Sequence, residues 1–355
     1  MKKAAHASSN PRENWVDYLR GISIFLVLLL HSHGSSTPIK NENYGWAMDL
    51  INTVNLLSAP FRMELMFFLS GLFVSRGMEK GVTKYFSGKV INILYPFILW
   101  SILIFALKEA KSVFLQSNPI DWTYLISIII GSTDLTWFLY DLFIFYLFIP
   151  IALNLKPLPV ILACVVASAF IPHEWHEGLP GVKYNFINNV FYYFLYFYFG
   201  ALATTRGYIH RNSPSGLWLS LSLLSVLGVF FIAWNFEVES TWPVYAPLVA
   251  FSFIGIVEVA KKLAKSERAR FLKYLGKHSM TFYLVHFPVQ GAASYFLCKY
   301  MGGGGLAVLI TLLGLGLFTP WLVIRLQEHA PWLRYAFSFR PKLSFVAPKT
   351  TSTQI

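Results

Sequence analysis

The chain has 355 residues, of which 55% are hydrophobic and only 13% charged, and its mean hydropathy is +0.53. Charged residues make up roughly a quarter of a soluble globular protein, so this composition excludes that class. The formal net charge of +12 would suit a nucleic-acid partner, but the basic residues are spread between hydrophobic blocks instead of forming one patch. We therefore predict a membrane protein with no nucleic-acid partner.

Apolar blocks of about 20 residues recur along the whole chain, and as a helix each is long enough to cross ~30 Å of hydrocarbon. No run of short alternating strands indicates a membrane barrel. We predict an all-α, polytopic helical bundle of about ten transmembrane helices, with nine to eleven allowed. The ten segments lie near residues 15–34, 48–76, 90–110, 134–154, 159–172, 187–204, 216–235, 243–263, 279–298 and 305–325. Residues 122–133 predict an additional interfacial helix.

The distribution of basic residues predicts how the bundle is oriented. With ten spans, the segments on the side of the N-terminus hold 22 Lys and Arg residues, and those on the opposite side hold five. Because short loops rich in Lys and Arg stay in the cytoplasm, both termini are predicted to be cytoplasmic and the membrane to be the cell inner membrane. We expect a cytoplasmic tail over residues 1–14, a transmembrane domain over 15–326 and a basic cytoplasmic tail over 327–355.

Ionisable side chains inside a predicted span are candidate functional residues, because charge at membrane depth costs from about 3 to more than 10 kcal/mol per residue. The first span carries Arg20 and His31, eleven positions apart. At about 100° per residue, both lie on one helix face roughly 16 Å apart. The alternative is that each side chain merely anchors the helix at one membrane interface.

Arg62 lies near the middle of the second predicted span and cannot easily reach either interface. It must face the bundle interior and find an anionic partner there. Glu258, Asp141 or a bound ligand could supply that partner, and the sequence does not choose among them. Glu64 points about 200° away on the same helix and is not expected to pair with Arg62.

Two further helices carry polar stripes. Asp134, Trp137 and Asp141 form one at the expected outer end of the fourth span. A second stripe runs through the ninth span, with members at i, i+4, i+7 and i+11, and consists of Ser279, Tyr283, His286 and Gln290. Several polar stripes on different helices imply a shared hydrophilic interior.

Two apparent motifs do not support a site. Residues 173–177, His-Glu-Trp-His-Glu, lack the helical His-Glu-x-x-His spacing of a zinc site. The glycine run at 302–305 is not followed by the Lys-Ser/Thr pair of a phosphate-binding loop. We therefore expect no metal and read the glycines as a turn.

Four short motifs follow one another along the chain. They are Arg20 and His31 with ten residues between them, Phe67-Phe68 followed by Ser70-Gly71, Trp137-Phe138-Leu139, and Tyr283-Leu284-Val285-His286. Together with about ten spans, this pattern resembles the acyltransferase-3 family of bacterial multi-pass membrane O-acyltransferases, from about Trp15 to Leu326. One departure concerns residues 89–94, directly before Tyr95-Pro96, where many relatives have arginines. Here Lys89 is the only cation in these six residues.

The resemblance implies transfer of an acyl group, most often acetyl from cytoplasmic acetyl-CoA, to a hydroxyl of an envelope carbohydrate. The expected partners are acyl-CoA, the carbohydrate acceptor and membrane lipid, with no permanently bound cofactor. His31 would act as general base on the acceptor hydroxyl, and Arg20 would bind phosphate or stabilise negative charge. Candidate residues for binding the donor or acceptor are Arg62, Ser70, Trp137, Asp141, Tyr283 and His286.

A transporter or flippase is the alternative from a different class, with the polar interior serving as a conduit for a polysaccharide or a small anion. The lack of internal repeats, and of helices broken by Gly or Pro in matching halves, counts against it.

Overall fold

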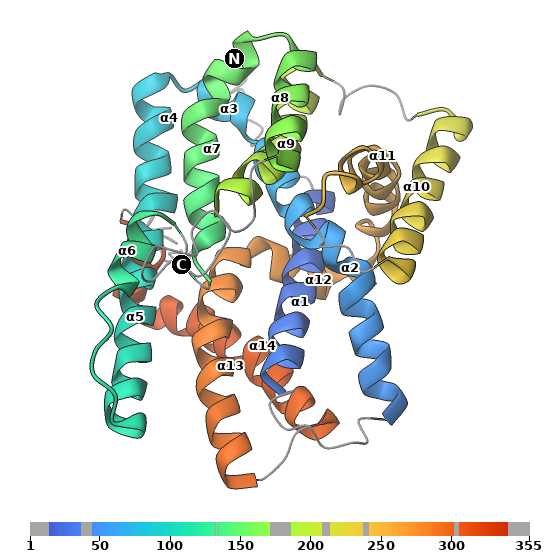
Figure 1. The fold of residues 1–355 in the computed structure, drawn as a ribbon. Coiled ribbons are helices and arrows are strands. Elements are labelled where there is room, and N and C mark those ends of the chain that lie inside the picture. The colour runs from blue at the N-terminus through green and yellow to red at the C-terminus, as the bar shows by residue number, and fades with distance from the viewer. Residues whose placement is uncertain are drawn as a thin grey trace, which may run out of the picture.

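The computed structural model describes residues 14–36, 45–131, 133, 135–170, 186–207, 214–236, 241–301 and 305–339. Within these ranges every regular element is a helix and there is no strand, which confirms the all-α class (Figure 1). Residues 1–13 and 340–355, which contain most of the two predicted tails, lie outside the described residues.

Each of the ten predicted segments corresponds to a helix or to joined helices. Six stretches in the described part of the chain are long and apolar enough to cross a membrane. They comprise α1 (Asn14–Ser36), α2 (Gly45–Gly71) with α3 (Val74–Met78), α4 (Val82–Lys89) with α5 (Tyr95–Gln116), α7 (Trp137–Asn154), α10 (Gly216–Asn235) and α14 (Leu306–His329).

The remaining predicted spans are also helical. Two of them, α8 (Pro157–Phe170) and α9 (Phe186–Thr205), are apolar, and α8 is short, with 14 residues, whereas α11 (Tyr245–Leu263) and α13 (Ser279–Met301) carry polar side chains. The short helix α6 (Tyr124–Ile129) falls within the predicted interfacial segment. The structure thus supports a multi-helix membrane protein, while ten spans and cytoplasmic termini stay predictions.

The third span begins earlier than its sequence pattern predicts. A π-helical segment, η1 (Val90–Leu94), joins α4 to α5, so the helix continues through Tyr95 and Pro96. Proline lacks the N–H that an uninterrupted α-helix needs, and a local π turn is one way to accommodate this loss inside a membrane helix.

Helix α1 occupies the centre of the bundle, beside α2, α11, α13, α14 and the short α12 (Arg270–Lys277) (Figure 1). It crosses α12 with backbone against backbone. A Cβ atom on Gly21 would lie 1.9 Å from the carbonyl oxygen of Leu272, and one on Gly276 would lie 1.7 Å from that of Asp17. Glycine therefore permits the contact that fixes α12 against the N-terminal half of α1.

Candidate active site

The two histidines of the predicted site lie against each other although 255 positions separate them in the sequence. His31 near the end of α1 has its ring centroid 5.3 Å from that of His286 on α13, and Phe287 packs edge-on against His31 at 5.0 Å. His286 is fully buried, whereas His31 is half-buried. The structure thus brings together one catalytic candidate and one binding candidate.

Hydrogen bonding fixes the tautomer of His286. Its Nδ1 lies 2.8 Å from the carbonyl oxygen of Phe282, which can only accept, so we assign the proton to Nδ1. In the neutral ring, Nε2 then carries the lone pair, and it has no hydrogen-bond partner among the described residues. His286 is therefore set up to accept a proton or a hydrogen bond from a bound hydroxyl.

The rest of the polar ridge on α13 also faces inward. Gln290 donates from Nε2 to Ser32 Oγ on α1 at 2.8 Å and to the carbonyl oxygen of Leu312 on α14 at 3.2 Å. Tyr283 donates its hydroxyl to the carbonyl oxygen of Leu135. These contacts hold α13 in register beside α1, so the ridge positions His286.

The start of α7 packs against neighbouring helices, while the expected outer position of its polar stripe stays a prediction. The Thr136 hydroxyl lies 2.6 Å from Ser101 Oγ on α5, and it is buried, as is Asp141. Polar groups of this turn are satisfied by α5 and α13 instead of by water, as a buried backbone requires. Asp134 lies outside the described residues.

Arg62 is buried as predicted, but its hydrogen-bond partner is neither predicted carboxylate. Its Nη1 donates to Asn55 Oδ1 at 3.3 Å. Glu258 instead forms an ion pair with Lys261 at 2.7 Å, and no hydrogen bond joins Asp141 to Arg62 in the described part of the chain. The charge of Arg62 acts on His31, which places the guanidinium at the same end of the interior.

Glu64 is the main polar residue that the sequence reasoning set aside. It is fully buried, and neither carboxylate oxygen has a hydrogen-bond partner among the described residues. As the 200° separation predicts, it does not hydrogen-bond to Arg62, yet the two charges interact, and the hydroxyl of Tyr193 lies within range of both. Its position in the middle of an apolar span was itself a signal of function.

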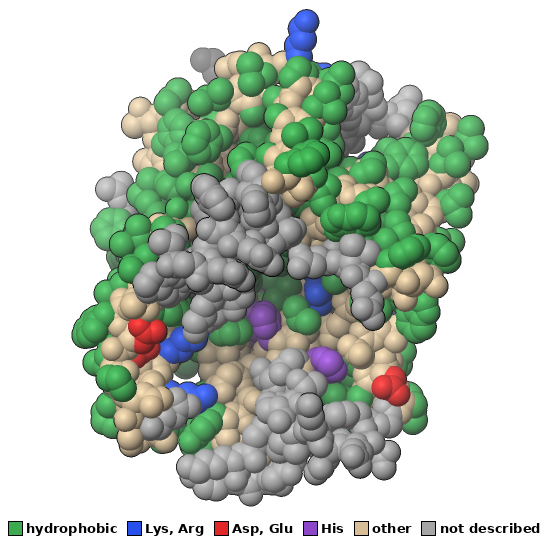
Figure 2. Space-filling model, in the orientation of Figure 1, with side chains coloured by type: hydrophobic (Ala, Val, Ile, Leu, Met, Phe, Trp, Pro, Cys, Tyr) green, Lys and Arg blue, Asp and Glu red, His purple; other side chains and the backbone are tan. Residues whose placement is uncertain are grey.

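We call this group the His31 cluster. It consists of His31, Arg62, Glu64, Asp141, Tyr193, Tyr283 and His286. Trp137 forms part of its wall, because its ring packs against those of Phe67 at 6.3 Å and Tyr193 at 5.4 Å. Figure 2 shows histidine and cationic side chains at the floor of a hollow on one face of the molecule.

A second group gathers around Arg20 at the other end of α1. The Arg20 guanidinium lies over the Phe73 ring, 4.8 Å from its centroid, and its charge also acts on Tyr146. Lys89 places Nζ 3.4 Å from the centroid of the same Tyr146 ring. The Tyr85 hydroxyl donates to the carbonyl oxygen of Tyr146 at 3.0 Å. We call these five residues the Arg20 cluster.

Ser70 connects the second helix to the Arg20 cluster through its backbone. Its carbonyl oxygen accepts a hydrogen bond from the Tyr146 hydroxyl at 2.8 Å. The Ser70 hydroxyl donates to the Met66 carbonyl oxygen at 2.8 Å within α2, so it is engaged in its own helix. The following Gly71 allows close packing on α9, since a Cβ there would lie 2.1 Å from the Phe197 carbonyl oxygen. In this geometry Ser70 and Gly71 pack α2 against its neighbours, and a role of Ser70 in binding the donor or acceptor stays a prediction.

In the described residues, no group of three or more His, Cys, Asp and Glu side chains is arranged to hold a metal ion. The rejected motif at 173–177 and glycines 302–304 lie outside the described residues.

Comparison with known proteins identifies the class. The family model for the acyltransferase domain of the acyltransferase-3 family matches residues 13–325, and the chain belongs to this family. The resemblance carried by the four short motifs is thereby confirmed. The protein is a membrane acyltransferase by family, built from apolar helices.

Two relatives illustrate the range of the family. The chain is 27% identical over 302 residues to inner membrane protein YcfT of Escherichia coli (strain K12), covering 78% of this chain and 79% of that protein. It is 24% identical over 235 residues to nodulation protein NolL of Mesorhizobium japonicum, covering 65% of this chain and 59% of that protein, which is less than two thirds of its length. No solved structure matches the chain.

Proposed function

We propose that this protein transfers an acyl group, in the simplest case acetyl, from acyl-CoA on the cytoplasmic side of the inner membrane to a hydroxyl of an envelope carbohydrate. The observation that carries the proposal is the pairing of two clusters on one helix. The Arg20 cluster offers cations at one end of α1, and the His31 cluster offers imidazoles at the other. The inner-membrane location of the relative YcfT supports the proposed membrane.

The Arg20 cluster suits the phosphate groups of an acyl-CoA. Arg20 and Lys89 come from different helices, Arg20 lying over the Phe73 ring and Lys89 over the Tyr146 ring, and the charge of Arg20 also acts on Tyr146. An arginine binds phosphate with two parallel hydrogen bonds, and a lysine adds a point charge. Lys89 is the single cation in residues 89–94, directly before Tyr95-Pro96, and Arg20 adds a second cation from α1. The acyl end of the donor would extend roughly 16 Å along α1 towards His31.

The His31 cluster suits attack by an acceptor hydroxyl. An imidazole takes the hydroxyl proton while the oxygen attacks the thioester carbonyl carbon. The C–S bond then breaks, the acyl group stays on the acceptor oxygen, and the leaving CoA thiolate receives the proton. His31 faces the accessible interior, and His286 presents a free Nε2 beside it. Arg62 would stabilise the negative charge that develops on the carbonyl oxygen.

The unpartnered polar atoms of this cluster support an acceptor rich in hydroxyls. Buried polar groups are nearly always hydrogen-bonded, so a cluster that leaves several unpaired is typical of a ligand site. His286 Nε2, Asp141 Oδ1 and both oxygens of Glu64 have no hydrogen-bond partner among the described residues. A carbohydrate can donate to each of these acceptors.

The test is chemical. The full chain, purified into lipid nanodiscs, is incubated with acetyl-CoA and an envelope glycan, and release of free thiol is measured together with acetylation of the glycan by mass spectrometry. We expect both with the wild type, neither with His31→Ala, and both with His33→Ala, which removes another histidine of the same helix. If the wild-type protein releases no thiol above a protein-free blank but carries the glycan across the bilayer when it is reconstituted in sealed liposomes, the transporter alternative holds instead.

A further inference from the structure

A cavity of about 740 Å³ lies outside both clusters, where the segment after α11 meets α14. Its walls come from η3 (Glu267–Ala269), α12 and α14. This segment belongs to the connection between α11 and α13, which has the largest number of basic residues of any predicted loop. The basic-loop count therefore places the cavity at the cytoplasmic edge of the membrane. Three arginines line it, namely Arg268, Arg270 and Arg325.

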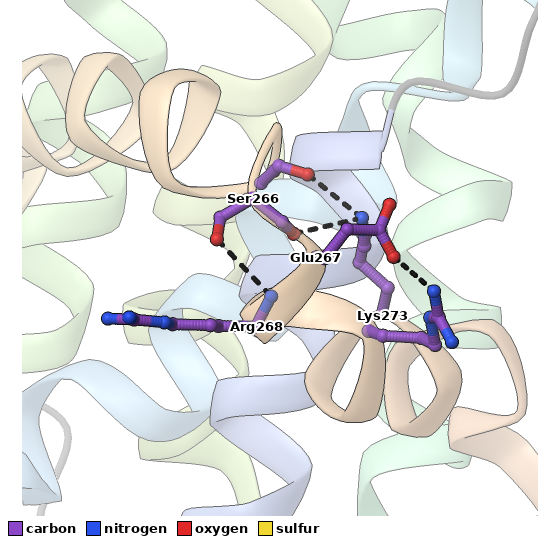
Figure 3. A network of polar contacts seen from close by, with 6 residues as sticks. Ser266, Glu267, Arg268 and Lys273 are labelled. Carbon is purple, nitrogen blue, oxygen red and sulfur yellow. Dashed lines mark hydrogen bonds and ion pairs between the residues drawn. The ribbon is translucent and has the colours of Figure 1, made fainter.

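The turn that presents these arginines is ordered by its own polar contacts (Figure 3). Ser266 Oγ accepts a hydrogen bond from the backbone N–H of Arg268 at 3.2 Å. Lys273 donates from Nζ to the carbonyl oxygens of Ala264 at 3.0 Å and Ser266 at 3.5 Å. Lys273 is therefore occupied in holding the turn, whereas the side chain of Arg268 extends away from these contacts in Figure 3.

The other two arginines have only weak partners. Arg270 pairs with Glu267, and the hydrogen bond from this guanidinium lowers the pKa of the carboxyl, so Glu267 is ionised at neutral pH. Arg325 reaches Glu328 at 3.5 Å, and the side chains of both pairs are largely exposed. Exposed ion pairs contribute little free energy, so a phosphate can replace them. No ion pair of Arg268 occurs within the described ranges.

The remaining walls are apolar and open towards lipid. Phe271 of α12 and Phe318 of α14 line the cavity with about half their surface exposed, at 51% and 53%, and Trp321 is 39% exposed. Gly314 lies one turn before Phe318, and a Cβ placed on it would meet nothing within 4 Å. Because α14 is a candidate membrane span, this apolar side faces the bilayer.

We propose that this cavity binds an anionic phospholipid of the cytoplasmic leaflet. Its phosphate lies between Arg268, Arg270 and Arg325, and an acyl chain runs along α14 past Phe318 and Gly314. Basic pockets between helices at this edge of a membrane recognise such head groups, and a tryptophan at the same level is typical of the interface. A soluble phosphate compound would use the arginines but leave the apolar half of the cavity without a partner.

Occupancy of the site is coupled to the centre of the bundle. Helix α12, which carries Arg270 and Phe271, packs with its backbone on α1 at Gly21 and Gly276. The ring of Phe282 also lines the cavity, and its carbonyl oxygen accepts the hydrogen bond from His286. A lipid that binds only the folded protein stabilises it by mass action, and here it would hold the segment that carries these contacts.

Delipidated full-length protein in a neutral detergent tests the proposal. Thermal unfolding is followed after addition of phosphatidylglycerol, phosphatidylcholine or free coenzyme A, and bound lipid is identified by native mass spectrometry. The test variant is Arg268→Gln/Arg270→Gln/Arg325→Gln. The matched control is Lys262→Gln/Lys265→Gln/Lys277→Gln, which removes three exposed cations of the same connection that do not line the cavity.

We expect phosphatidylglycerol to raise the unfolding temperature of the wild type and the control by several degrees, and phosphatidylcholine to do so much less. The test variant should lose this difference, and Arg268→Gln alone, which breaks no ion pair found in the described residues, should reduce it. Equal responses to the two lipids, or an undiminished phosphatidylglycerol response in both arginine variants, would overturn the proposal. A coenzyme A response that disappears only in the arginine variants would overturn it as well, because the site would then recognise a soluble phosphate compound.

Discussion

The Arg20 cluster and the His31 cluster, near opposite ends of α1, differ in the hydrogen-bond partners that the protein gives their polar groups. At the Arg20 end, the hydroxyls of Tyr85 and Tyr146 both donate to backbone carbonyls, and Lys89 lies over an aromatic ring. At the His31 end, His286 Nε2 and both oxygens of Glu64 are buried without a hydrogen-bond partner in the described part of the chain. The hydroxyls of Tyr85 and Tyr146 in the Arg20 cluster thus find partners within the protein, whereas the named acceptors of the His31 cluster are open to a bound molecule.

Because of this difference, we expect the Arg20 cluster and the His31 cluster to have different roles in the reaction. A cluster whose partners are satisfied can hold a charged group in a fixed place, which suits binding of the donor. A cluster with unpaired acceptors and a histidine of fixed tautomer suits a reacting hydroxyl. Substitutions at the two ends should therefore change different kinetic quantities.

The largest effect is expected from His31→Ala. Loss of a general base typically costs about 10²- to 10⁴-fold in rate, so we expect kcat to fall by at least about 10²-fold while the protein still inserts in the membrane. Single-turnover acyl transfer with saturating acetyl-CoA is the measurement, with His33→Ala as control. An active His31→Ala enzyme would exclude the general-base role.

The next effect concerns the stability of the His31 end. Arg62→Leu leaves Asn55 Oδ1 without its hydrogen-bond donor and Glu64 without its nearby cation, and a buried polar group left unsatisfied costs about 1–3 kcal/mol. We expect a lower thermal unfolding temperature and folding yield, and partial recovery when Glu64→Gln is added.

Arg76→Leu, at an exposed position, is the control for charge removal. If Arg62→Leu keeps normal stability but binds donor or acceptor more weakly, then the ligand is the partner of Arg62 and Glu64 is not. If both stability and turnover stay normal, neither account of Arg62 is right.

A smaller effect is expected at the donor end. Arg20→Lys keeps the charge but not the two parallel hydrogen bonds to phosphate, so we expect KM for acetyl-CoA to rise about 10-fold, or ~1.4 kcal/mol. The turnover at saturating donor should change much less. Steady-state thiol release over a range of acetyl-CoA concentrations measures both quantities. A fall in kcat with unchanged KM would move Arg20 to the reacting centre.

The smallest effect is expected from Lys89→Gln. Lys89 supplies a point charge beside Arg20, so its removal should raise KM for acetyl-CoA a few-fold and make binding less sensitive to salt. Lys84→Gln, at an exposed position of the same helix, should change neither. Identical behaviour of the two lysine variants would remove Lys89 from the donor site.

The sequence predicted the helices and the faces of α1 and α13, because apolar periodicity and single polar residues report those directly. The sequence placed His31 and His286 each on a polar helix face, but it did not predict that these two faces meet. The sequence did not predict the partner of Arg62, since rotation about one helix says nothing of which neighbours surround it. It set Glu64 aside for the same reason, although Tyr193 on α9 lies within range of its charge.

The contacts of the turn before α7 are also absent from the periodicity of one segment. Its expected outer position stays a prediction, and the contact of Thr136 with Ser101 on α5 could not be read from its polar stripe. The third span begins upstream of the predicted residue 90, because α4 continues through η1 into α5 as one helical stretch. The contact of Lys89 Nζ with the Tyr146 ring depends on that continuous helix, so the sequence before Tyr95-Pro96 did not predict it.

Direct measurement of coenzyme A binding tests the division of labour along α1 most sharply. Equilibrium binding of acetyl-CoA to the wild type, His31→Ala and Arg20→Lys is measured in nanodiscs, without acceptor. We predict that His31→Ala binds acetyl-CoA as tightly as the wild type although it does not transfer the acyl group, and that Arg20→Lys binds about 10-fold more weakly. Wild-type affinity in Arg20→Lys together with lost affinity in His31→Ala would contradict the account.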